Sequence, residues 1–224
     1  MTARMDMTLV RVFRGDAGEA VPDDAVNVVR NGGLIAMPTD SFYALGASVF
    51  DEAAVRRVCA IKGLREHKPI LALIADRTQL AALVARIPPA AEVLMARFWP
   101  GPLTIVFPAS PRLPAVLTAG SGTIGVRWPA QSMLQRLLRE TGPLTGTSAN
   151  RSGAEPARTA QDVEEALGSD VDLIVDGGPS SGPLPSTVVE TVGAVRVLRE
   201  GPIRRAAIEA ALAEAGITVV AEGG

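Results

Sequence analysis

The chain has 224 residues, of which 47% are hydrophobic and 21% are charged, so it can bury a sizeable core, and disorder is excluded as the state of most of it. Its net charge of −2 provides no global attraction to nucleic acid or to an anionic membrane. A single cysteine excludes an internal disulfide. The sequence shows neither an apolar run of the ~20 residues that span a bilayer nor the apolar core of a signal peptide. We therefore expect a cytoplasmic protein without a membrane partner.

In the first half of the chain, predicted helices and strands alternate. Apolar residues at helical spacing precede the run 31–33 (NGG), which suits a C-terminal cap, and Asp51 suits an N-cap. A continuous apolar run at 70–74 is typical of a strand buried on both faces. In chain order we expect a helix over 23–30, a strand over 34–37, a helix from Asp51 to Gly63, a strand over 70–74, and helices over 78–85 and 90–98.

The second half continues the alternation and ends in a hairpin and a helix. Gly193 separates two β-rich runs, which favours a hairpin, while Pro202 and Gly216 bound the last helix. In chain order we expect strands over 103–107 and 123–127, helices over 132–139 and 163–167, strands over 173–175, 187–190 and 195–198, and a helix over about 203–215.

This alternation predicts an α/β (α+β) fold in a single domain over residues 1–224, with a core over about 20–205. Its sheet is expected to be twisted, mixed and mostly open, with helices flanking it. The loop-rich stretch 177–185 (GGPSSGPLP) is too short for a domain boundary, and we interpret it as a loop beside a site.

Rare residue types gather in one stretch of the sequence. Of the 22 basic residues only Lys62 and Lys68 are lysines, and Tyr43, Cys59 and His67 are the only residues of their types. Chance in an arginine-rich composition explains the cysteine. A lysine kept in such a chain indicates a position where a compact, flexible ammonium is needed, since the two cations are not interchangeable. We therefore expect the chemistry to centre on the stretch that holds these five residues.

Five polar clusters are candidate parts of a binding site. Hydroxyls and an aspartate follow a strand at 38–41, and strand ends in α/β sheets bind ligands. Cations gather at 62–69, which suits a triphosphate or a carboxylate, and the hydroxyl and amide groups at 145–150 suit a phosphate, a ribose or a base edge. Arg127 at a strand end suits a carboxylate, and hydroxyls at 186–187 open one arm of the hairpin. Each cluster alone is equally compatible with a self-capped turn or a solvated charged loop.

Several motifs of nucleotide-binding and hydrolytic enzymes are absent. The sequence contains no GxxxxGK[ST] and no GxGxxG, so neither a P-loop nor a Rossmann fingerprint explains nucleotide binding. It contains no GxSxG, and its single histidine disfavours both a Ser-His-Asp triad and a zinc site. The residues alone therefore favour an anion-binding α/β enzyme without a covalent nucleophile.

Taken together, seven motifs in one order, from about Gly32 to Ile203, resemble the YrdC-like family of threonylcarbamoyl-AMP synthases in its short, single-domain form. They are PTDSFYALG, IKGLREHKPI, FWPGPLT, TIGVRWP, TSANRSG, PSTVVE and LREGPI. The resemblance implies a YrdC-like twisted α/β domain with a concave, positively charged face. It also implies a nucleotidyltransferase that converts L-threonine, bicarbonate and ATP into L-threonylcarbamoyladenylate and pyrophosphate, with Mg²⁺ bound mainly through the ATP phosphates. The product would serve proteins that transfer the threonylcarbamoyl group to adenosine 37 of tRNA, and a weak contact with tRNA itself is one option.

The resemblance also assigns roles to individual positions. L-Threonine would contact Thr39, Tyr43, Arg127 and Ser186, and Lys62 and Lys68 would be the catalytic cations. The positions that resemble ATP-binding ones are Arg65, Lys68, Thr123, Ser148, Asn150 and Arg199. No metal ligand from the protein is implied.

The sequence departs from the family pattern at three positions near these residues, and at one of them Ser41 replaces a threonine and keeps the hydroxyl. The family motif KGRP reads KGLR here, so Leu64 takes the place of an arginine, and Arg65 is a candidate substitute. Ala44 replaces a glycine. Two alternatives stay open: a non-catalytic module that binds a nucleotide or RNA in the same groove, and a carbamoyl-adenylate enzyme with a different acceptor. Few aromatic side chains and a negative net charge disfavour RNA as the main ligand.

Overall fold

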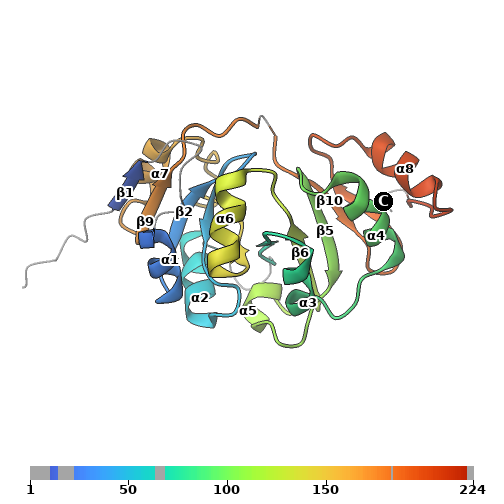
Figure 1. Cartoon of the computed structure of the whole chain (residues 1–224), viewed down its shortest axis with the longest axis horizontal. Coiled ribbons are helices and arrows are strands. Elements are labelled where there is room, and N and C mark those ends of the chain that lie inside the picture. The colour runs from blue at the N-terminus through green and yellow to red at the C-terminus, as the bar shows by residue number, and fades with distance from the viewer. Residues whose placement is uncertain (1–10, 15–22, 64–68, 183, 221–224) are drawn as a thin grey trace, which may run out of the picture.

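The computed structural model describes residues 11–14, 23–63, 69–182 and 184–220 (Figure 1). Strands form two mixed sheets with helices packed against them, which confirms the predicted α/β class. Within these described residues, no helix is long and apolar enough to cross a bilayer.

The first sheet has five strands in the order β1-β9-β2-β3-β8. β9 (Leu173–Asp176) pairs in parallel with both β1 (Arg11–Arg14) and β2 (Ile35–Pro38). β2 pairs antiparallel with β3 (Tyr43–Gly46), which pairs antiparallel with β8 (Thr147–Ser148). Every residue of β2 and β3 is buried, so the short polar turn that joins them is held firmly at one edge of the sheet.

The second sheet has six strands, and its centre is the pair β5–β6. Its order is β11 (Arg196–Arg199), β10 (Thr187–Glu190), β5 (Leu103–Pro108), β6 (Thr123–Arg127), β4 (Ala72–Leu73) and β7 (Leu144–Thr145). β10 runs parallel to β5 and antiparallel to β11, while β6 runs antiparallel to β5. The predicted hairpin of the C-terminal region is therefore confirmed as β10–β11.

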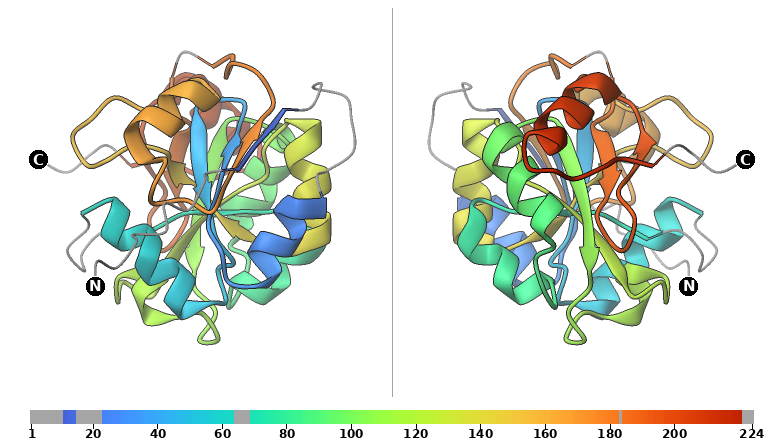
Figure 2. Two further views of the ribbon diagram at one scale, coloured as in Figure 1. Left: turned by 90° about the vertical axis from the view of Figure 1, so that its left-hand side faces the viewer. Right: turned by 90° about the vertical axis from the view of Figure 1, so that its right-hand side faces the viewer.

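Helices cover both sheets. They are α1 (Asp23–Arg30), α2 (Glu52–Ile61), the 3-10 turn η1 (Arg77–Gln79), α3 (Leu80–Leu83), α4 (Pro89–Phe98), α5 (Ala115–Thr118), α6 (Ser132–Thr141), α7 (Ala160–Leu167) and α8 (Arg205–Ala213). α1 and α6 lie side by side on one face of the first sheet, with α7 on its other side, and α4 and α8 pack together beside the second sheet (Figures 1 and 2).

Amphipathic spacing explains how α1 and α6 seal the first sheet. α1 turns Ala25, Val26 and Val29 inward, and α6 turns its leucines inward, onto the side chains of Ile35 and Met37 from β2. Each fully buried leucine or isoleucine contributes about 1.5–3 kcal/mol through the hydrophobic effect. A larger core continues across the second sheet, where Phe107 and Leu94 are fully buried.

Residues 144–148 pass directly from the second sheet into the first, and we call them the linking segment. Its first two residues form β7 of the second sheet and its last two form β8 of the first, with Gly146 between them. A Cβ on Gly146 would lie 2.5 Å from Cγ of Leu73 and 2.7 Å from Cδ1 of Leu71, so only glycine fits there. Thr145 is fully buried and donates its hydroxyl to the Leu45 carbonyl at 2.8 Å. The linking segment thereby fixes the spacing of the sheets.

Most predicted helices and strands are present, with bounds shifted by a few residues. The larger differences concern elements whose conformation depends on pairing with distant strands. The strands form two sheets rather than the single sheet expected. The elements that were not predicted are β1, β3, α5, β7 and β8. The predicted helix over 78–85 is divided into η1 and α3, and the apolar run 70–74 pairs only at Ala72–Leu73. α8 begins at Arg205 rather than at 203.

Candidate active site

Two adjoining cavities lie between the sheets and share a wall formed by Leu71, Thr147, Ser148 and Arg199. We call the one of about 490 Å³ the lysine lobe, because Lys62 lines it, and the one of about 500 Å³ the arginine lobe, because Arg127 lines it. The β8 half of the linking segment therefore stands at the boundary between the lobes.

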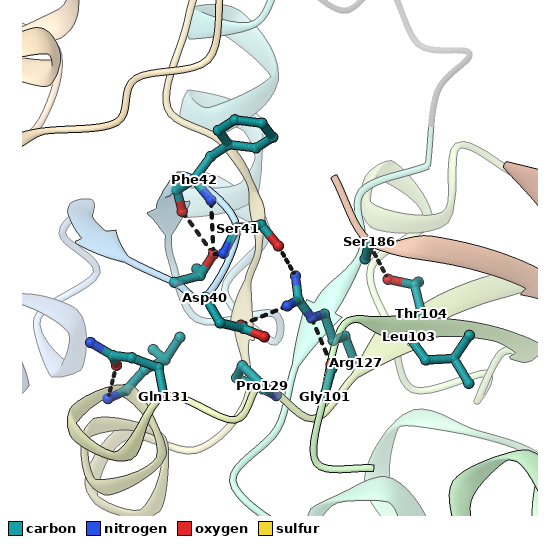
Figure 3. A network of polar contacts seen from close by, with 12 residues as sticks. Asp40, Ser41, Phe42, Gly101, Leu103, Thr104, Arg127, Pro129, Gln131 and Ser186 are labelled. Atoms are coloured by element: carbon teal, nitrogen blue, oxygen red, sulfur yellow. Dashed lines mark hydrogen bonds and ion pairs between the residues drawn. The ribbon is translucent and has the colours of Figure 1, made fainter. Parts of the chain in front are cut away.

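In the arginine lobe the guanidinium of Arg127 is held on three sides (Figure 3). Its Nε donates to the Gly101 carbonyl at 3.1 Å, Nη1 donates to Oγ of Ser41 at 2.9 Å, and Nη2 pairs with a carboxylate oxygen of Asp40 at 2.6 Å. Only 4% of Arg127 is exposed, and this burial lowers its pKa, an effect that the charge of Asp40 opposes. The cation is therefore fixed in direction and keeps its charge, as a carboxylate-binding site requires.

Thr39 both lines the arginine lobe and closes the turn after β2. Its hydroxyl donates to the Phe42 carbonyl at 2.7 Å and accepts the backbone N–H of Ser41 at 3.0 Å and of Phe42 at 3.2 Å. The structural reading of this cluster as a self-capped turn is thus correct, and it is compatible with a site, because the turn aims Ser41 at Arg127.

Tyr43 ties the loop 177–185 to the arginine lobe. The ring is fully buried, and its hydroxyl donates to the Gly178 carbonyl at 2.8 Å. Burial, together with the nearby charge of Asp176, raises the pKa of this phenol, so it stays protonated. The loop also packs closely on the turn: a Cβ on Gly182 would lie 2.4 Å from the Asp40 carbonyl. The stretch predicted as a loop beside a site therefore lies beside one.

Ser186 and Arg199 join the two lobes. The Ser186 hydroxyl lies 2.8 Å from Oγ1 of Thr104, and its carbonyl accepts Nε and Nη2 of Arg199 at 3.1 and 2.9 Å. Burial lowers the pKa of Arg199, and the neighbouring charge of Arg127 lowers it further. Two guanidinium groups thus face the middle of the cleft, where an anion would relieve their mutual repulsion.

In the lysine lobe, oxygens from two residues surround the Lys62 ammonium. Its Nζ lies 2.9 Å from the Ser148 carbonyl and 3.3 Å from its hydroxyl. Two further oxygens, the carbonyl and the side-chain Oδ1 of Asn150, lie at 2.8 and 2.6 Å. Burial lowers the pKa of Lys62 from 10.5 to about 8. The ammonium therefore orders the turn after β8 and remains beside the cavity.

The cleft offers little to a metal ion directly. No cluster of three or more His, Cys, Asp or Glu side chains that could hold a metal occurs among the described residues. Among the described residues that line the lysine lobe, Glu190 is the one with a carboxylate side chain. A cation in this lobe would have to be held largely by an anionic ligand.

The predicted site residues separate into the two lobes. The four positions assigned to L-threonine, Thr39, Tyr43, Arg127 and Ser186, all line the arginine lobe. Of the other positions, Lys62, Thr123, Ser148, Asn150 and Arg199 line the lysine lobe. Leu64, Arg65, His67 and Lys68 lie outside the described residues. The grouping is a finding, whereas the individual roles stay predictions.

Sequence reasoning missed several neighbours of these residues. Asp40 was named as part of the polar cluster at 38–41 and as a turn former, but not as the ion-pair partner of Arg127. Arg158, whose guanidinium lies 5.0 Å from the centre of the Phe42 ring, was not singled out. Nor were Glu190 and Leu198, which line the lysine lobe. The alternation of β10 was the available signal for Glu190.

Comparisons with known proteins show which family the chain belongs to. Residues 27–201 match the model of the Sua5/YciO/YrdC family, which is described as "Telomere recombination". The threonylcarbamoyl-AMP synthase of Pyrococcus abyssi is 38% identical over 192 residues, which is 85% of this chain and 56% of that protein. The synthase of Thiobacillus denitrificans is 42% identical over 164 residues, 72% of this chain and 86% of that protein.

A solved structure shows the same fold. The crystal structure of P. abyssi Sua5 complexed with L-threonine has a TM-score of 0.83 and 35% identity, and the match covers 95% of this chain and 62% of that one. The chain therefore spans only part of the P. abyssi protein while matching nearly the whole of the T. denitrificans one. On the match of residues 27–201 and on these identities, the chain belongs to the Sua5/YciO/YrdC family.

Proposed function

We propose that the protein is an L-threonylcarbamoyladenylate synthase, which converts L-threonine, bicarbonate and ATP into threonylcarbamoyl-AMP and pyrophosphate. The observation that carries this proposal is the pair of lobes with a common wall, one built around a buried guanidinium and the other around a buried ammonium. Related proteins in P. abyssi and T. denitrificans are named as synthases of this kind, and a P. abyssi relative is described with L-threonine bound.

L-Threonine belongs in the arginine lobe. Its carboxylate would bind the second N–H of Nη1 and of Nη2 of Arg127, since Ser41 and Asp40 each engage one N–H of these nitrogens. The Thr39 and Ser186 hydroxyls lie in the same lobe and would orient the rest of the amino acid. Tyr43 contributes indirectly, because its hydroxyl holds the loop that borders the lobe.

ATP belongs in the lysine lobe, with its phosphates toward the shared wall. Lys62 and Arg199 supply positive charge there, and Thr123, Ser148 and Asn150 supply hydroxyl and amide groups. Arg65 and Lys68 are the further cations that the sequence offers to the phosphates. Mg²⁺ would be held mainly by the phosphates, which fits the scarcity of carboxylates in the described lining.

The reaction then needs positioning rather than a protein nucleophile. The threonine nitrogen adds to the carbon of CO2 or bicarbonate and loses a proton, and water leaves if bicarbonate is used. A carbamate oxygen next attacks the α-phosphorus of ATP, and pyrophosphate departs. Cations around the phosphates stabilise the charge that moves during this step, and the shared wall holds the two reactants in contact.

The wider role follows from the product. A threonylcarbamoyl-adenylate is an activated acyl group, and transferase proteins would pass it to adenosine 37 of tRNA in the cytoplasm. A weak contact with tRNA and a positively charged concave face belong to the same proposal.

One experiment tests the activity. Purified protein is given ATP, L-threonine, bicarbonate and Mg²⁺, and pyrophosphate release is measured with each component omitted in turn. We expect release only in the complete mixture. Release that does not need threonine contradicts the proposal and points to another acceptor, and no release in the complete mixture points to a non-catalytic binding module.

A further inference from the structure

We infer that Glu190 recognises the amino group of the nucleotide base, and that the base lies on an apolar shelf formed by Val106, Val188 and Leu198. The inference rests on the proposed function, because it takes the ligand of the lysine lobe to be ATP. It concerns the side of that lobe formed by β5, β10 and β11, where Arg199 is the one predicted site residue in the described lining.

Strand register places Glu190 in this position. Thr187 and Val189 of β10 are buried, so Val188 and Glu190 point to the opposite side, toward the lysine lobe. Glu190 is level with Val106 on β5, and Val106 is level with Gly125 on β6. These three residues therefore form one row across the cavity floor. Val188 lies in the neighbouring row, which is the row of Arg127, because its partner Thr104 pairs with Arg127 on β6.

A β-bulge adds Leu198 to the same shelf. Val188 pairs with Arg199 and Val189 with Val197, so Leu198 is an extra residue that has no partner on β10. It lines the lysine lobe and is 49% exposed, whereas Val197 beside it is buried. The bulge thus turns two consecutive residues of β11 toward the ligand, one apolar and one cationic. Apolar contacts on the face of a base with a polar group at its edge are the usual construction of a base pocket.

Gly125 leaves room for a flat ligand on this floor. A Cβ there would lie 3.2 Å from Cγ2 of Thr104 and 3.5 Å from Cβ of Leu71, so a larger residue would fill the space above the strand. Arg199 is level with Val188, one row nearer to Arg127 than Glu190 is, and it also lines the arginine lobe. A nucleotide with its phosphates at Arg199 directs its base toward the Glu190 row.

The chemistry of Glu190 selects for a hydrogen-bond donor. A carboxylate only accepts, so it suits the N6 amino group of adenine. Its ion-pair partner Arg196 approaches no closer than 3.6 Å and is half exposed, which leaves the carboxylate with accepting capacity. A base that lacks the amino group would leave this charged acceptor without its partner, which is the arrangement that gives strong discrimination.

The test compares ATP with purine riboside 5′-triphosphate, which carries hydrogen in place of the amino group. The ratio of their kcat/KM values and the ratio of their Kd values by calorimetry are measured for the unaltered protein and for Glu190→Met, which keeps the side-chain length without the acceptor. We expect ATP to be favoured about tenfold or more by the unaltered protein, and by less than about twofold in the variant. Arg196→Gln, which removes only the ion-pair partner, should keep the full preference.

The outcomes separate this inference from its premise. An ATP preference that survives in Glu190→Met overturns the inference. So does a variant that instead loses its preference for ATP over 2′-deoxy-ATP, because the carboxylate would then be bonded to the ribose. If ATP binds with the expected preference but no pyrophosphate is released, the inference about Glu190 stands and the proposed synthase activity fails.

Discussion

Asp40 gives Arg127 a partner before any substrate is present. Removing one member of a buried ion pair leaves the other charge uncompensated, which typically costs ~3–5 kcal/mol. The side chain of Asp40 is 20% exposed, so water offsets part of that cost. Asp40 therefore acts by positioning Arg127 and keeping it stable in the empty cleft.

We predict that Asp40→Ala lowers the free energy of unfolding by about 2–4 kcal/mol and that saturating L-threonine restores part of the loss. The substrate carboxylate would supply the negative charge that Asp40 no longer provides. Urea unfolding with and without L-threonine measures both effects, and Asp24→Ala, on exposed helix surface, is the control. An equal loss in both conditions would show that threonine does not reach Arg127.

Lys62 predicts a pH dependence of activity. Burial lowers its pKa to about 8, so the free protein loses this positive charge above about pH 8, whereas an exposed lysine keeps its charge to about pH 10. We expect kcat/KM for ATP to fall above pH 8. The fall in kcat should occur at higher pH, because bound phosphates favour the ammonium.

The measurement is a pair of pH–rate profiles at constant ionic strength. In Lys62→Met, which is similar in length and neutral, activity should be lower and the alkaline fall should disappear. A kcat/KM that stays constant up to pH 9.5 in the unaltered protein would contradict a role for the ammonium in binding ATP.

At the scale of single residues, the sequence predicted which side chains line the site better than it predicted their hydrogen-bond and ion-pair partners. Thr39, Arg127 and Ser186 follow from strand ends and motif order, and they line one lobe. The contact between Ser41 and Arg127 joins residues 86 positions apart, and no local spacing encodes it. The same is true of Asp40, whose place after Thr39 equally suits a turn.

At the scale of elements, the linking segment is the least tolerant part of the cleft. Gly146 passes within contact distance of Leu71 and Leu73, so a methyl group there would push the linking segment away from β4. Ser148, two residues on, would move with it and lose its alignment with Lys62.

We predict that Gly146→Ala destabilises the protein by about 1–3 kcal/mol and lowers kcat more than it raises KM for threonine. Leu73→Ala should partly relieve the clash, so the double variant should be more stable than the sum of the two single effects predicts. Thermal unfolding and steady-state kinetics of all three variants provide the test. Strict additivity would indicate that the two side chains do not meet. Gly142→Ala, where a Cβ meets nothing within 4 Å but φ is +80°, separates backbone strain from the clash.

Three of the strands that were not predicted lack a sequence pattern that would reveal them. β7 and β8 are two residues long, too short for any periodicity to appear. β3 is buried at all four positions and ends in glycine, so it lacks the alternation typical of a strand, and its pairing comes from β2 and β8. In contrast, α1 and α6 follow directly from helical spacing and were predicted closely.

At the scale of the whole molecule, the two sheets enclose the cleft, so ligands that touch both should stabilise the fold. A ligand at a concentration 100 times its Kd contributes about 2.7 kcal/mol, and domains of this size gain about 2–4 °C in Tm per kcal/mol. We therefore predict a rise of about 5–10 °C with ATP, Mg²⁺ and L-threonine together, in the absence of bicarbonate.

Differential scanning fluorimetry with single ligands and with the mixture checks this prediction. Because the lobes share a wall, the combined shift should exceed the larger single shift. Arg127→Ala should abolish the threonine component and leave the ATP component. A combined shift no larger than that of ATP alone would mean that threonine does not bind beside the nucleotide.

The wall shared by the lobes also bears on the lifetime of a reaction intermediate. Carbamates of amino acids revert readily to amine and CO2, so an intermediate that must diffuse between sites would decay on the way. Thr147 and Ser148 border both cavities, so in the proposed reaction a carbamate formed in the arginine lobe would lie beside the nucleotide that it attacks. Capture by the nucleotide then competes with decarboxylation at one place, and because decarboxylation returns threonine and CO2 without consuming ATP, the short path affects the rate of product formation and leaves the product yield per ATP unchanged.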